Sequence, residues 1–319
     1  MSKPFASSAD LEEKTETLEV LDNGVYALTA EGDPNVGAVE GEDFLVCIEA
    51  RATPAAARDW LAKLRQHTDK PIKYLVLTHY HAVRVLGASA FGAEHIIASE
   101  TTRKLIEERG KQDWDSEFGR MPRLFKQPEE IPGLTWPTQT FDSHMSIDLG
   151  GNRGQLDLQF CGRGHTAGDI AVWHDKSKTL FAGDLVEAQA ALYTGDAFHM
   201  DWSAGTLDRV KAFGAEKLIG GRGAVALGRA DCEAAIEQTR SFLTGMIEHV
   251  GAAHRRGGTL KDAFEATHEA LEPKFGRWPI FEHCLPFNVQ RLWDEFEGID
   301  WPRIWTMERD REVWAQLQG

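Results

Sequence analysis

Three stretches of the sequence place histidine or aspartate beside apolar runs, where metal ligands are commonly found. His79 and His81 follow the run IKYLVLT, and side chains two positions apart in an extended segment project to the same side, so both imidazoles can bind one ion. His165 lies in GRGHTAGD, whose glycines permit a tight turn, and Asp184 follows LFAG at another strand end. A lone histidine is most often a hydrogen-bonded structural residue. Together, however, these motifs predict a metal site at the ends of strands.

The elements that must position these residues follow from the pattern of apolar residues and turns. We expect strands over 18–30 (with a turn inside), 35–41, 43–50, 71–79, 95–99, 155–162, 169–175, 179–184 and 216–221. We expect helices over 53–67, 85–93, 100–112, 207–214, 230–256, 259–273 and 288–298. Thr53 is the expected N-cap of the first helix, and Ser203 or Thr206 that of helix 207–214. Residues 112–140 are rich in Trp, Pro and charge, and we expect them to be irregular and to cover a site or an interface.

The order of these elements does not alternate as regularly as a doubly wound sheet requires. Two β-rich halves, each followed by helices, instead predict a two-sheet sandwich with helices outside. The helices at the C-terminal end each carry an apolar stripe, so we expect them to pack on this core.

The four motifs THYHAVRVLGA, GHTAGDIAVW, TLFAGDLV and LIGGRGAV, in this order and spacing, resemble the metal-binding loops of the metallo-β-lactamase fold superfamily. That superfamily includes glyoxalase II-like thioesterases, lactonases, sulfatases and β-lactamases. The resemblance implies an α/β fold, a four-layer αβ/βα sandwich with its active site along one edge of the two sheets. We therefore expect a polar leader over 1–16, a metallo-β-lactamase-like domain over 17–228, and a helical C-terminal extension over 229–319 packed on it.

The resemblance implies a first metal site that is complete. His79 and His81 match the first two ligands, His165 the third, and Asp184 the carboxylate that bridges two metals in the family. Three neutral imidazoles, a carboxylate and an open position form the ligand set of a catalytic zinc, which lowers the pKa of water and polarises a carbonyl. We expect one transition-metal ion here, zinc first, although iron or manganese suits the same ligands. The alternative is a metal-free, hydrogen-bonded cluster of imidazoles.

The second metal site of the family is degenerate in this sequence. Val83 replaces the family's aspartate, Arg84 its histidine, and Arg222 in GGRGA the histidine of the last loop. Valine has no lone pair and arginine stays protonated, so neither can bind a second cation. We expect Arg84 and Arg222 to act with Asp184 in the site and to replace the charge of the missing ion. They would either clamp Asp184 or bind a carboxylate or phosphate of the substrate.

Several other residues are weaker candidates. Tyr80 and Tyr193 could donate to an oxyanion, although we expect them to pack with satisfied hydroxyls. Glu187 is expected to be a solvated carboxylate, and His199 lies in a segment where a substrate-facing loop is expected. The Trp-rich segment near the C-terminus is typical of a docked tail or a dimer interface.

Composition excludes several classes of function. The net charge of −15 argues against nucleic-acid binding, and no run reaches the roughly 18 apolar residues of a membrane span. The N-terminal segment has no apolar core of a secretory signal. The four cysteines lie far apart, which suggests buried thiols in the reducing cytoplasm: Cys47, Cys161, Cys232 and Cys284.

These observations predict a cytoplasmic, mononuclear, metal-dependent hydrolase that acts on a small ester, thioester or lactone, with an anionic substrate matching the arginines. The alternative is a metal-free pseudoenzyme that binds a ligand or a partner, and a metal-free lyase is a more remote one. The expected partners are a small-molecule substrate and a second copy of the chain, with neither nucleic acid nor membrane.

Overall fold

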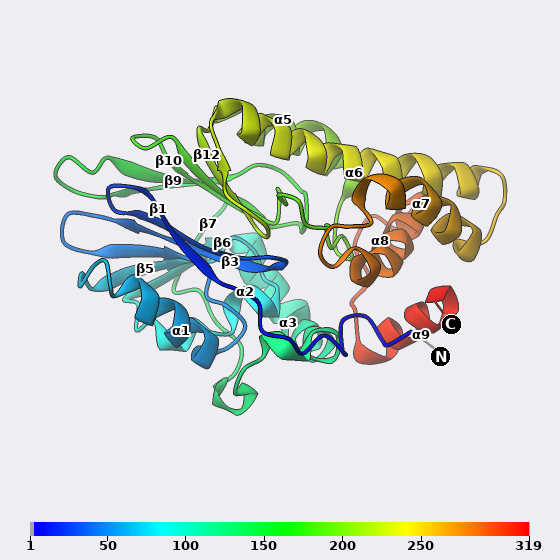
Figure 1. Cartoon of the computed structure of the whole chain (residues 1–319), viewed down its shortest axis with the longest axis horizontal. Coiled ribbons are helices and arrows are strands. Elements are labelled where there is room, and N and C mark those ends of the chain that lie inside the picture. The colour runs from blue at the N-terminus through cyan, green and yellow to red at the C-terminus, as the bar shows by residue number, and fades with distance from the viewer. Residues whose placement is uncertain (1–2, 319) are drawn as a thin grey trace.

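The computed structural model describes residues 3–318 and shows two β-sheets packed face to face, with helices on their outer faces (Figure 1). The first sheet has the strand order β1-β2-β3-β4-β5-β6-β7 and the second β13-β12-β11-β10-β9-β8. The strands of the first sheet are β1 Thr17–Asp22, β2 Val25–Ala30, β3 Asp33–Glu40, β4 Leu45–Ile48, β5 Ile72–Val76, β6 His95–Ser99 and β7 Gln139–Phe141. Those of the second are β8 His144–Asp148, β9 Gln155–Phe160, β10 Ile170–His174, β11 Thr179–Gly183, β12 Lys217–Gly220 and β13 Ala226–Leu227.

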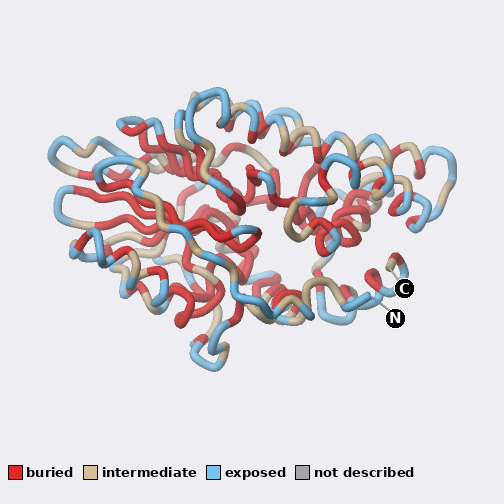
Figure 2. Tube along the Cα trace, viewed as in Figure 1, coloured by how far each residue is buried: buried red, intermediate tan, exposed pale blue. Residues whose placement is uncertain are grey.

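The two sheets share an apolar layer because their strands alternate in the side chains they present. On β2, Val25 and Ala27 face the second sheet, whereas Tyr26 and Leu28 belong to the cluster on the outer face. Both faces are therefore covered, and every residue of β2 and β3 is buried. Figure 2 shows the same burial along the strands of both sheets, with exposed residues concentrated at turns and on the outer helices. The expected sandwich is confirmed.

Helices complete the outer layers on both sides. The helices are α1 Pro54–Leu64, α2 Ala82–Val85, α3 Glu100–Arg120, α4 His199–Asp201, α5 Leu207–Ala212, α6 Arg229–Arg255, α7 Leu260–Phe275, α8 Phe281–Phe296 and α9 Met307–Gln318. Trp60 and Leu64 of α1 pack on the first sheet. Thr53 is the N-cap of α1 as expected, since its side chain accepts a hydrogen bond from the Ala56 N–H.

The C-terminal helices join the core of the second sheet. Leu180 and Leu218 of that sheet belong to one apolar cluster with Phe242 of α6 and Phe287 of α8. The chain then crosses from α8 to α9, and α9 lies against α3 on the side of the first sheet (Figure 1). Residues 297–306 between α8 and α9 contain no helix or strand, and this crossing segment passes close to the candidate site.

Several boundaries differ from the expectations. Strand β5 ends at Val76 rather than His79, because the Thr78 N–H donates to the Glu49 side chain instead of a neighbouring strand. The expected helix over 85–93 is split into α2 and a single 3₁₀ turn at Ala88–Ala90.

The segment 112–140 is not irregular throughout. Helix α3 continues to Arg120, and two 3₁₀ turns and β7 follow.

Strands β8 and β13 and helix α9 were not expected. Neither Ser203 nor Thr206 caps α5, because a π-helical turn, Trp202–Thr206, leads directly into it. Residues 1 and 2 of the expected leader and residue 319 of the expected extension lie outside the described residues.

No helix within residues 3–318 is both long and apolar enough to cross a membrane.

Candidate metal centre

Three loops at one edge of the sandwich bring the four predicted metal ligands together. His79 and His81 lie between β5 and α2, His165 in the loop between β9 and β10, and Asp184 directly after β11. Gly183 has φ +53° and passes so close to the Thr78 side chain that a Cβ at this position would collide with it. This glycine lets β11 end against the loop that carries His79.

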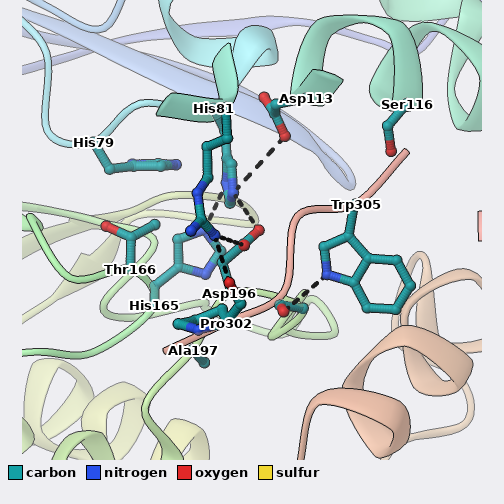
Figure 3. A network of polar contacts seen from close by, with 12 residues as sticks. His79, His81, Asp113, Ser116, His165, Thr166, Asp196, Ala197, Pro302 and Trp305 are labelled. Carbon is teal, nitrogen blue, oxygen red and sulfur yellow. Dashed lines mark hydrogen bonds and ion pairs between the residues drawn. The ribbon is translucent and has the colours of Figure 1, made fainter. Parts of the chain in front are cut away.

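The side chains converge with one nitrogen or oxygen each toward a common centre, and Figure 3 shows the three imidazoles side by side. The facing atoms lie within 4.8 Å of one another. His165 Nε2 lies 2.9 Å from His81 Nδ1 and 3.4 Å from Asp184 Oδ2, which is itself 3.6 Å from His79 Nε2. A tetrahedral zinc with ligand bonds of 2.0–2.1 Å separates its ligand atoms by about 3.3 Å.

The donor set fits a metal ion. All four residues are buried, with at most 5% of their surface exposed. Among residues 3–318, His79 Nε2 is buried and has no hydrogen-bond partner, and such an atom is costly unless an ion or a water molecule satisfies it. The residues therefore could hold one ion through His79 Nε2, His81 Nδ1, His165 Nε2 and Asp184 Oδ2.

Polar groups hold the outward-facing atoms of three of these side chains. Thr78 Oγ1 lies 3.0 Å from His79 Nδ1, and Asp196 Oδ2 lies 3.3 Å from His81 Nε2. The outer oxygen of Asp184, Oδ1, accepts a hydrogen bond from Arg84. Contacts of this kind fix the orientation and tautomer of a metal-binding imidazole.

Burial and charge set the protonation of the ligands. Burial lowers the pKa of His165 to about 3 and that of His79 well below its usual value, so both stay neutral. Burial alone would raise the pKa of Asp184, but the neighbouring Arg84 holds it well below its usual range. Burial would also lower the pKa of His81, yet the carboxylates of Asp113 and Asp196 raise it to about 9. A metal at His81 Nδ1 therefore requires the release of a proton.

Arg84 donates to three oxygens of the protein. Its Nη2 donates to Asp184 Oδ1 and to the Gly221 carbonyl at 2.8 Å, and its Nη1 donates to the Asn35 carbonyl at 3.1 Å. The guanidinium is 1% exposed, and its Nη donors are used by the protein itself. This geometry is a clamp on Asp184.

Arg222 occupies a different position from the one expected of a second clamp. Its Nη1 donates to the Gly32 carbonyl at 2.9 Å, and its Nε lies 3.8 Å from Glu187 Oε1. Within residues 3–318 the Arg222 side chain forms no hydrogen bond or ion pair with Asp184, although its charge helps to lower the pKa of Asp184. Val83 packs in the apolar cluster of the first sheet and contributes no polar atom.

Two buried carboxylates border the centre, and the prediction for one of them was wrong. Glu187 was expected to be solvated but is 1% exposed, and burial together with the charge of Asp184 raises its pKa. Glu49 is also buried, and burial raises its pKa to about 7. Glu49 ends the apolar run LVCI, which is the same strand-end pattern as LFAG before Asp184, so the sequence contained a signal for it.

Sequence reasoning also missed Asp113, Asp196 and Arg109. Asp113 and Asp196 lie on either side of His81 in Figure 3, with Asp113 Oδ1 4.0 Å from its Nε2. Arg109 Nη1 donates to Asp196 Oδ1 at 3.1 Å. No local pattern marks these residues, because the pairs join segments far apart in the chain.

Of the weaker candidates, the two tyrosines lie near the centre and His199 does not face it. Tyr193 lies beside His81, with ring centroids 5.7 Å apart. Its hydroxyl is buried and has no hydrogen-bond partner in the described part of the chain, rather than being satisfied as expected. Tyr80 is buried between the two histidines of the first loop. His199 does not face the centre, because its two ring nitrogens lie within 3 Å of Glu295 and Thr194 oxygens.

A pair of sheets with outer helices and a His₃Asp cluster at one edge defines a class of metal-dependent hydrolase folds, and comparison with known proteins agrees. The model of the "Metallo-beta-lactamase superfamily" matches residues 29–222, more than half of the chain. The chain belongs to this superfamily.

Individual relatives are distant. A linear primary-alkylsulfatase of Pseudomonas sp. (strain ATCC 19151) is 23% identical over 88% of this chain, which spans only 60% of that enzyme's length. A metallo-beta-lactamase type 2 of Pseudomonas aeruginosa is 24% identical over 63% of this chain and 75% of its own. The solved structure of a metallo-beta-lactamase from Pontibacter korlensis superimposes with a TM-score of 0.57 and 21% identity, covering 72% of this chain and 99% of that one. This structural likeness shows the fold.

Proposed function

We propose that this protein is a mononuclear metal-dependent hydrolase of small molecules. The observation that carries the proposal is that the two carboxylate oxygens of Asp184 face different groups. Its Oδ2 faces His79 and His165, whereas its Oδ1 accepts a hydrogen bond from Arg84. A carboxylate held this way can complete one metal site but cannot bridge two ions, so Arg84 supplies the positive charge that a second ion would bring.

The chain's own residues support hydrolysis at this centre. A bound ion, with zinc as our first choice, would polarise the scissile bond and lower the pKa of water. His79, His81, His165 and Asp184 would hold it. We propose that Tyr193, whose ring lies beside His81 and whose hydroxyl has no hydrogen-bond partner among residues 3–318, donates to a developing negative charge on the substrate.

The substrate class follows from both the family and the site. The names of the relatives specify cleavage of an alkyl sulfate ester and of a β-lactam, which supports hydrolysis of an ester, thioester or lactone here. Because the Nη donors of Arg84 are bound to protein oxygens, we propose that it orders Asp184 rather than the substrate. The four cysteines are buried and unpaired, which supports a cytoplasmic location.

A metal-free ligand-binding protein is the second candidate. The burial of all four side chains argues against turnover at this centre, since a substrate must reach groups that are at most 5% exposed. The two candidates are distinguished by whether the same residues are needed for metal binding and for turnover.

The test is hydrolysis of a panel of aryl esters, acyl thioesters and lactones by protein reconstituted with zinc, iron(II) or manganese(II). We expect turnover that is lost on chelation and in His79→Ala and His165→Ala, which also lose the metal. His144→Ala is the matched control, because His144 is an exposed residue of β8, and it should retain both. Metal-independent binding of the same compounds without turnover would favour the second candidate.

A further inference from the structure

Residues 299–306, which we call the strap, cross from α8 to α9 over the side of the metal centre that carries His81. Several hydrogen bonds to buried groups hold the strap. Arg291 donates to the carbonyls of Ile299 and Asp300, Arg109 Nη1 donates to the Pro302 carbonyl at 3.1 Å, and Trp305 Nε1 donates to the Gly195 carbonyl at 2.9 Å. Figure 3 shows Pro302 beside Asp196.

The strap also closes a small cavity next to the ligands. Tyr80, Thr166 and Asp196 form its inner wall, and Trp301 and Pro302 of the strap are among its other lining residues. Thr166 and Tyr80 are the direct chain neighbours of His165 and of His79 and His81. A movement of the strap would therefore change the surroundings of the metal ligands.

A continuous set of polar contacts joins the strap to one ligand. The same Arg109 Nη1 that donates to the Pro302 carbonyl also donates to Asp196 Oδ1, and Asp196 Oδ2 lies 3.3 Å from His81 Nε2. Arg109 and Asp196 are 2% and 4% exposed, so water does not compete with these contacts. The Arg109 guanidinium carbon lies 5.6 Å from the centroid of the Trp301 ring. Trp301 therefore contacts the guanidinium from the side of the strap.

We propose that Asp196 is a positioning residue for the metal ligand His81, and that Arg109 couples this position to the docking of the strap. The inference rests on the proposed metal site. When His81 Nδ1 binds an ion, its Nε2–H points at Asp196, and a carboxylate there fixes the ring and strengthens the bond from Nδ1. Because coupling between sites is reciprocal, an ion that holds His81 in place also holds the strap closed.

The first experiment measures zinc affinity by competition with a chromophoric chelator, together with the visible spectrum of the cobalt(II) form. We expect Asp196→Asn to weaken zinc binding by about 10–100-fold and to change the cobalt(II) spectrum. Glu40→Gln is the matched control, because Glu40 is a buried carboxylate of β3 paired with Lys70 at 2.6 Å and does not contact the strap, so it should not change zinc affinity. Arg109→Met should weaken binding, and Arg109→Lys should restore it in part by keeping a positive charge beside Asp196.

The second experiment uses the unaltered protein, so it does not depend on how a variant folds. Hydrogen exchange of strap amides should slow when zinc is added, while exchange in α7 stays the same. In the double variant Asp196→Asn/Arg109→Met, which removes both buried charges together, zinc should no longer slow exchange in the strap.

The outcomes separate the two proposals. If the unaltered protein binds no zinc, the proposed function fails. If it binds zinc and Asp196→Asn binds equally tightly, or the strap exchanges at the same rate with and without zinc, the coupling is refuted and the metal site stands.

Discussion

The buried ion pair of Arg84 and Asp184 gives the most quantitative prediction for the stability of the metal-free protein. Replacing Arg84 with Met leaves Asp184 buried without its partner, which costs about 3–5 kcal/mol. It also removes the Arg84 donor from the carbonyls of Asn35 and Gly221. The Gly221 carbonyl keeps the Asn35 N–H, whereas an unsatisfied Asn35 carbonyl costs about 1–3 kcal/mol. Domains are stable by only about 5–15 kcal/mol, so Arg84→Met should lie near the limit of folding.

The companion change Asp184→Asn should cost less, because Arg84 keeps its two carbonyl acceptors. The double variant Arg84→Met/Asp184→Asn should then be more stable than Arg84→Met alone, since no unpaired charge remains buried. The assay is unfolding in guanidinium chloride with EDTA present. Arg58→Met serves as the control, because the Arg58 side chain is 52% exposed in its pair with Glu130 and should lose at most about 1 kcal/mol. Additive losses in the double variant would refute the clamp.

Three further substitutions test separate parts of the structure by the same unfolding assay. Gly221→Ala should cost about 1–3 kcal/mol of stability and also weaken zinc binding in chelator competition. The reason is that the new Cβ would collide with Asp184 and lie 2.8 Å from Arg84 Nη2. Unchanged zinc affinity would contradict the account. Gly110→Ala, inside α3 and with only side chains at 3.5 Å or beyond, should instead gain about 0.5–1 kcal/mol, and a loss would show that α3 is packed differently. Thr259→Ala should cost about 1 kcal/mol because it removes the capping box that Thr259 forms with Asp262, and no loss would contradict that cap.

The fold and the convergence of the four candidate ligands could be predicted because their signals are local. His79, His81, His165 and Asp184 lie in loops beside apolar strands, and strand ends gather at one edge of a sheet. The capping of α1 was predictable for the same reason, since Thr53 and Pro54 are adjacent in the chain.

The length of α3 could not be predicted because its buried face is charged. Four charged residues at helical spacing are buried along α3: Arg109, Asp113, Glu117 and Arg120. This part of the helix has no apolar stripe from which its helical structure could be predicted. Their burial depends on partners such as Asp196 and Asp310, which come from distant parts of the chain. The contact of His81 with Asp196 was hidden for the same reason.

The distribution of the arginines shows a similar limit. Arg84 and Arg222 were both expected to replace the charge of one metal ion. The groups that each side chain contacts depend on where the folded backbone places it. Arg84 lies on α2 directly behind Asp184, whereas Arg222 extends to the carbonyl of Gly32 in the turn between β2 and β3. Sequence position alone does not separate these outcomes.

The number of metal ions per chain tests the central claim most directly. Protein purified without chelator, and the same protein after zinc addition and removal of excess ions, should be analysed by elemental mass spectrometry against protein concentration. We predict about one ion per chain in the unaltered protein, and none in His79→Ala/His165→Ala, because only one set of ligands is complete. Two ions per chain would show that Arg84 does not replace a second metal, and no ion after zinc addition would show that the His₃Asp cluster is not a metal site.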